Sequence, residues 1–164
     1  MRLDRAWIAA RIAHAGGMCL LDEVLDWDAA RIRCRSGTHR RTDNPLRAAG
    51  SLGAACAVEY AAQAIAVHGA LLGAAAVRVS TCVVDAGPPP RAGFLACVRD
   101  LKMRITRLDD IDADLIVEAT RIAGDAGSAL YAFTVDRDGA AASPGLVSGR
   151  AAILVDRSRA GAAP

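Results

Sequence analysis

AACAVEYAAQAIAVHGALL, residues 54–72, is an alanine-rich stretch that is apolar on every side at the period of an α-helix. Four polar side chains interrupt it: Glu59, Tyr60, Gln63 and His68. A helix of this length that is apolar all round is typical of a protein interior. The stretch therefore predicts a single long helix at the centre of the fold.

Glu59 is the most informative of these residues. An ionised carboxylate in a protein interior costs on the order of several kcal/mol unless it is paired, hydrogen-bonded or reached by water. Catalysis is one reason for a protein to keep such a residue. Gln63 follows four positions later and shares the helical face of Glu59, whereas His68 lies about half a turn away. We therefore expect Gln63, and not His68, to belong to a site built on Glu59.

Length and composition limit the possible classes of protein. At 164 residues and 53% hydrophobic residues, the chain predicts one folded domain, residues 1–157, and a disordered tail at 158–164. Aromatic residues make up only 4% and the net charge is +2. These values argue against recognition of nucleic acid by stacked rings or by a basic surface.

The cysteines and the N-terminus indicate the cellular compartment. Residues 1–17 carry charges every few positions and lack the apolar core of a signal peptide. Glu59, Gln63 and His68 interrupt the apolar stretch, which argues against a membrane span. We therefore expect a soluble cytoplasmic protein without metal or cofactor. The cysteines are spaced without any CxxC pair and are expected to be small buried hydrophobes: Cys19, Cys34, Cys56, Cys82 and Cys97.

Strand candidates flank the central helix on both sides. The first two are joined by a turn at Asp28 and predict a hairpin with one buried face. A single apolar helix is best covered by a curved antiparallel sheet that wraps around it, which is the α+β layering of the hotdog fold. The predicted strands are residues 18–27, 31–35, 77–84, 94–106, 115–122, 129–135 and 146–155.

Two strings resemble the β-hydroxyacyl-acyl carrier protein dehydratases. HAGGMCLLDEV, residues 14–24, is similar to that family's motif, in which a histidine precedes an apolar strand and an aspartate follows it by eight positions. EYAAQ, residues 59–63, matches the family's Glu-x-x-Ala-Gln string on the central helix. The two strings together look closest to the dehydratases of aryl polyene pigment clusters.

The chain departs from the fatty-acid members of this family at several places. Residues 38–41 and Pro45 stand where those members carry Gly-His-Phe-Pro and Pro-Gly stretches before the helix. Gly17 stands where a proline commonly follows the histidine. Cys97 aligns with a glycine whose backbone N–H binds the thioester oxygen, a role that survives a change of side chain.

The resemblance implies a dehydration of 3-hydroxyacyl thioesters, with His14 as the base and Glu59 as the acid. Neutral histidine suits removal of the C2 proton because its pKa of roughly 6.5 lies near operating pH. A carboxylic acid kept neutral by apolar neighbours suits protonation of the departing hydroxyl. The resemblance further implies that Gln63, Cys97 and Val98 contact the substrate.

The resemblance also implies partners. Two subunits are expected to join their sheets so that His14 of one faces Glu59 of the other. The substrate is expected to arrive on an acyl carrier protein, for which Arg40, Arg41 and Arg47 are candidate docking residues.

Three other interpretations stay open at this point. The chain could be a hotdog thioesterase whose Glu59 activates water. It could also be the weakly active supporting subunit of a dehydratase heterodimer, a reading that the altered approach to the helix suggests. In the third interpretation Glu59 is an ordinary core carboxylate at a dimer seam.

Overall fold

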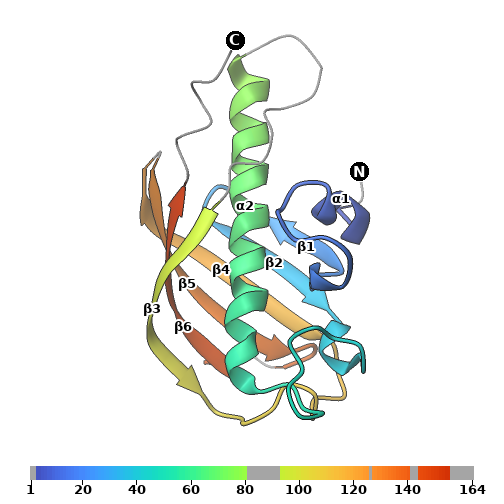
Figure 1. Cartoon of the computed structure of the whole chain (residues 1–164). Coiled ribbons are helices and arrows are strands. Elements are labelled where there is room, and N and C mark those ends of the chain that lie inside the picture. The colour runs from blue at the N-terminus through green and yellow to red at the C-terminus, as the bar shows by residue number, and fades with distance from the viewer. Residues whose placement is uncertain (1–2, 81–92, 126, 141–143, 156–164) are drawn as a thin grey trace.

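The computed structural model describes residues 3–80, 93–125, 127–140 and 144–155. A long helix, α2, lies across one face of a six-stranded antiparallel sheet (Figure 1). This arrangement confirms the α+β layering predicted from the sequence. The sheet order is β1-β2-β4-β5-β6-β3. The elements are α1 Arg5–Ala9, η1 Gly16–Met18, β1 Glu23–Trp27, β2 Arg31–Ser36, η2 Thr38–Arg40, η3 Ala54–Cys56, α2 Ala57–Ser80, β3 Gly93–Met103, β4 Leu115–Gly124, β5 Ser128–Arg137 and β6 Val147–Val155.

The first hairpin forms as predicted. The carboxylate of Asp28 closes its turn by accepting hydrogen bonds from the backbone N–H groups of Ala30 at 2.7 Å and Arg31 at 2.9 Å. Ile32 and Cys34 on β2 are fully buried against α2, as their alternation with arginines indicates. The hairpin therefore supplies one end of the core.

A short N-terminal helix that the sequence analysis did not foresee holds the chain ahead of β1. The Asp4 side chain caps α1 by accepting a hydrogen bond from the N–H of Trp7. Arg5 then reaches across to the Asp22 carboxylate at 2.8 Å and to the carbonyl of Cys19 at 2.8 Å. These contacts fix both ends of the segment that carries His14.

Two predicted strands are wrong in part. Residues 18–22 are not a strand, and β1 begins only at Glu23, because the preceding segment is buried and bonds side chains of α2 and of the end of β2. Residues 77–80 belong to α2 instead of a strand, because extending an existing helix is cheaper than nucleating a new element. Residues 81–84 of the same prediction, like the predicted tail at 158–164, lie outside the described residues.

Strand β3 occupies an edge of the sheet and pairs with β6, far along the chain. Its register shifts between Arg99 and Lys102, and Asp100 adopts a positive φ of 53° at that irregularity. Every residue of β3 except Val98 is exposed. Such a bulged, charged edge is a common protection against unwanted strand pairing.

Helix α2 is buried along its first half. The part of the chain at 54–76 is long and apolar enough to cross a bilayer by length and composition, and half of its most apolar window is buried within the fold, as in a core helix. Cys19 and Cys34 are buried as predicted, whereas Cys56 is half-buried. Cys97 is exposed, contrary to prediction, because it lies on the edge strand. Cys82 lies outside the described residues.

His68 is buried between α2 and the sheet and should make stability depend on pH. Its Nε2 lies 2.8 Å from the carbonyl of Asp28, and its Nδ1 lies 3.0 Å from the Tyr131 hydroxyl. Desolvation holds the pKa of His68 below its usual range, and nearby Arg121 adds to this, although the Asp28 contacts oppose it. Because the unfolded chain binds this proton more readily, stability should be lost as the pH falls below about 6.5.

Thermal unfolding at pH 7.5 and pH 5.5 checks this expectation. His39 has its pKa lowered in the same direction by burial, so a His68→Leu variant should keep part of the effect. We expect the fall in Tm between the two pH values to be smaller in His68→Leu than in the wild type. An equal fall in both proteins would contradict a role for His68.

Candidate active site

His14 and Glu59 meet at the N-terminal part of α2. His14 lies in the segment between α1 and η1, and Glu59 lies in the first turn of α2. The imidazole Nε2 is 3.1 Å from the carboxylate Oε1, and both side chains are about one third exposed, at 34% and 30%. Glu59 is therefore less buried than the sequence suggested. Its carboxylate is paired and also open to a ligand.

Both members of this pair belong to the same chain. The sequence comparison implied instead that His14 of one subunit faces Glu59 of the other. The structure describes one subunit, so pairing between subunits stays a prediction. Within this chain, Gln63 on α2 holds the segment after His14 through its bonds to the carbonyl of Met18 and the N–H of Leu20. An imidazole and a carboxylate at this distance can exchange a proton directly.

Gln63 joins the pair from one turn further along α2. It is fully buried, and its Nε2 donates to Glu59 Oε1 at 3.0 Å and to the carbonyl of Met18 at 2.8 Å. Its Oε1 accepts a hydrogen bond from the N–H of Leu20 at 2.9 Å. These three bonds use both N–H groups of the amide and one acceptor position of its oxygen. Gln63 thus orients the Glu59 carboxylate relative to the segment that follows His14.

Asp22, the aspartate of the histidine-led string, has a structural role. One carboxylate oxygen binds Arg5, and the other accepts a hydrogen bond from the N–H of Gly37 at 2.7 Å. Arg5 was not singled out from the sequence, where it is one of many scattered arginines. Arg5 acts through its bonds to Cys19 and Asp22, which lie outside its own helix and are not adjacent in the sequence.

The remaining predicted site residues lie elsewhere. Cys97 and Val98 are on β3, at the opposite edge of the sheet from β1, and Val98 packs against the core. Arg40 pairs with Asp114 at 2.5 Å, Arg41 with Asp43 at 2.7 Å and Arg47 with Asp109 at 3.0 Å. His68 makes the core contacts described above and does not join the pair, as predicted.

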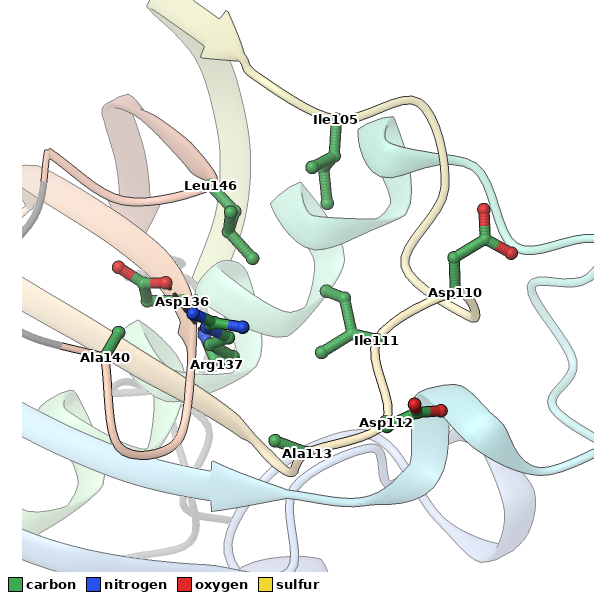
Figure 2. Close-up of a pocket in the computed structure, with 9 residues that line it drawn as sticks. All are labelled: Ile105, Asp110, Ile111, Asp112, Ala113, Asp136, Arg137, Ala140 and Leu146. Carbon is green, nitrogen blue, oxygen red and sulfur yellow. Dashed lines mark hydrogen bonds between the residues drawn. The ribbon is translucent and has the colours of Figure 1, made fainter.

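An open cavity of about 550 Å³ lies near the loop between β3 and β4. Figure 2 shows the side chains of Ile105, Ile111 and Leu146 around it, with Arg137 beside them. Its lining includes none of the predicted site residues. The His14–Glu59 pair is therefore a separate feature on the surface of the single chain.

The fold and the pair together define a class of protein. One long helix wrapped by a six-stranded antiparallel sheet, with a carboxylate in the helix, is the architecture of hotdog proteins. The family model of the ApeP-like dehydratases (ApeP dehydratase) matches residues 6–150. The chain belongs to the ApeP-like dehydratase family.

Solved structures agree on the fold. The dehydratase heterocomplex ApeI:P from Xenorhabdus doucetiae superposes with a TM-score of 0.72 at 18% identity, covering 91% of this chain and 90% of that chain. A mutant thioesterase from Pseudomonas aeruginosa gives a TM-score of 0.50 at 12% identity, covering 81% and 79%. A thioesterase from Haemophilus influenzae gives 0.50 at 11% identity, covering 82% and 77%. Comparison with curated proteins gives no significant match.

Proposed function

We propose that this protein dehydrates 3-hydroxyacyl thioesters carried by an acyl carrier protein to 2-enoyl thioesters, in a fatty-acid-like or polyketide-like pathway of the aryl polyene kind. The observation that carries the proposal is the 3.1 Å contact between His14 and Glu59 in a dehydratase-family chain. This contact places one base and one acid within reach of the adjacent C2 and C3 atoms of an acyl group.

The proposed reaction moves two protons. His14 Nε2 removes the proton from C2 of the acyl group, and the electron pair of that bond forms the C2–C3 double bond. The C3–O bond breaks, and the hydroxyl leaves as water with a proton from Glu59. The thioester oxygen carries charge during the transfer and needs donors, for which backbone N–H groups at the start of α2 are the candidates within this chain.

The His14–Glu59 contact also lets both side chains return to their starting protonation states. After one turnover His14 holds the extra proton and Glu59 is ionised. The proton can return across the 3.1 Å separation between Nε2 and Oε1 without another group. Gln63 stabilises the ionised carboxylate meanwhile, because it donates a hydrogen bond to the same oxygen.

A second hotdog subunit is proposed to pair at β3. This edge strand is exposed along its length and carries large apolar side chains, with Phe94 at 59% and Met103 at 50% exposure. The bulge and charges of β3 oppose nonspecific pairing, but its outer edge has no strand partner among the described residues and can add the strand of a complementary subunit. The pairing would give a homodimer or a heterodimer with another hotdog protein, and native mass spectrometry of the chain alone distinguishes the two.

Docking of the carrier protein is proposed at Arg40 and Arg41. Their side chains are 40% and 49% exposed despite their salt bridges, so an acidic partner can reach them. Arg47 is only 16% exposed and holds Asp109, which also binds Arg107 and the N–H of Leu52. Arg47 is therefore better explained as a structural residue than as a docking residue.

The direct test is incubation of the purified protein with a 3-hydroxyacyl carrier protein, followed by mass spectrometry of the acyl group. Loss of one water supports the dehydratase. Release of free acid supports the thioesterase alternative, in which Glu59 activates water against the thioester. Reaction only after a second hotdog protein is added would indicate a supporting subunit.

A further inference from the structure

A buried polar cluster adjoins the pair through Tyr60, which follows Glu59 on α2. It consists of Ser36, Thr38, Asn44 and Tyr60, each at most 5% exposed. Tyr60 comes from the first turns of α2, and the other three come from the end of β2 and the loop that follows it. Ser36 and Thr38 bond the carbonyl of Leu20, and Tyr60 and Asn44 bond Thr38.

Hydrogen bonds connect the side chains of this cluster to one another and to Leu20. Asn44 accepts from the N–H of Leu46 at 3.0 Å, which fixes its amide so that Nδ2 donates to the Tyr60 hydroxyl at 3.0 Å. The Tyr60 hydroxyl is also hydrogen-bonded to Thr38 Oγ1 at 2.9 Å, and either oxygen can donate. Thr38 in turn donates to the carbonyl of Leu20 at 2.8 Å. A continuous series of hydrogen bonds therefore runs from the loop to Leu20.

Both backbone polar groups of Leu20 are hydrogen-bonded to side chains. Its carbonyl also accepts a hydrogen bond from Ser36 Oγ at 2.6 Å. Its N–H donates to Gln63 Oε1, and the same Gln63 amide donates to the Glu59 carboxylate. The cluster and Glu59 are thus connected through Leu20 and Gln63, on the segment that begins at His14.

We propose that Tyr60 and Thr38 are positioning residues, which hold the segment after His14 at the distance from Glu59 that proton transfer requires. This inference rests on the proposed function. Neither hydroxyl is exposed, so each acts through Leu20 and not by contact with substrate. Displacements of about 1 Å at a reacting pair can cost up to roughly a hundredfold in rate, which makes such a clamp catalytically important.

The two tyrosines of the chain provide a matched comparison. Tyr131 is also buried, at 2% exposure, and its hydroxyl bonds His68 instead of the cluster. Tyr60→Phe and Tyr131→Phe each remove one buried hydroxyl, so both should lower the Tm. At a temperature where both are folded, Tyr60→Phe should reduce kcat at least about tenfold with KM little changed, and Tyr131→Phe should keep the wild-type kcat. Equal kcat values in the two variants would overturn the proposal.

A second pair of variants covers the case in which Tyr60→Phe does not fold. Thr38→Ser keeps the hydroxyl and should retain kcat, whereas Thr38→Val keeps the shape, removes the hydroxyl and should lose kcat by a similar factor. Equal kcat values in these two variants would also refute a positioning role.

A measurement independent of catalysis separates this inference from the proposed function. In ¹⁵N-labelled protein, the imidazole signals of His14 should shift in Tyr60→Phe, because the His14–Glu59 contact loosens, and should stay unchanged in Tyr131→Phe. Unchanged His14 signals in both variants would overturn the positioning role. An inactive wild type in which only Tyr60→Phe shifts these signals would refute the dehydratase assignment alone.

Discussion

Replacing Glu59 by glutamine, or His14 by alanine, is expected to lower kcat for dehydration by about 100- to 10,000-fold, the usual contribution of a general acid or base. Glutamine keeps the shape of Glu59 and its bond to Gln63 but has no proton to give. Alanine removes the base altogether. Steady-state kinetics with a 3-hydroxyacyl carrier protein measures both effects, and the double variant should be little worse than either single one.

Glu118→Gln is the control for this prediction. It is the same substitution at a half-exposed carboxylate on β4, paired with Arg31 and remote from the pair along the chain. It should leave kcat unchanged. If Glu59→Gln retains activity within about threefold of the wild type while it is folded, Glu59 is not the acid.

Mixing two inactive variants should restore no dehydratase activity. A dimer that contains one His14→Ala chain and one Glu59→Gln chain has no complete pair if each pair forms within a chain, as the 3.1 Å contact indicates. Were the pairs formed between chains, one of the two sites would be intact, and about half of the wild-type activity would return. Two different affinity tags isolate the mixed species for assay.

The control is a mixed dimer of one wild-type chain and one doubly substituted chain. With the pair formed within a chain, this species keeps one working site and about half of the activity. If the pairs form between chains, this mixed dimer has no working site and no activity. The two mixed species therefore have opposite expected results, and recovery in the His14→Ala plus Glu59→Gln mixture would refute the single-chain site.

Much of the fold was predictable because its signals are local. The apolar period of residues 54–72 predicted the helix, and the Asp28 turn with the alternation of Ile32 and Cys34 predicted the first hairpin. The strand predicted from residue 77 was wrong over residues 77–80, because the preceding alanines carry the helix through them. Local patterns identify elements better than they identify element boundaries.

The site was predictable only in part. His14 and Glu59 were identified through motif resemblance, which carries information about chemistry but not about which chain supplies each residue. Thr38 and Asn44 were missed as cluster members because they are ordinary polar residues of a loop in the sequence. Their role depends on burial against Tyr60, and only the packed structure shows it.

The place of β3 in the sheet has a consequence for synthesis on the ribosome. β3 ends at Met103, but its partner β6 begins only at Val147. At roughly 5–20 residues per second, β3 waits for several seconds after it emerges before β6 is available. During that interval the backbone N–H and C=O groups of β3 have no strand partner on either edge, and the charges of Arg99 and Lys102 discourage its aggregation with other nascent chains.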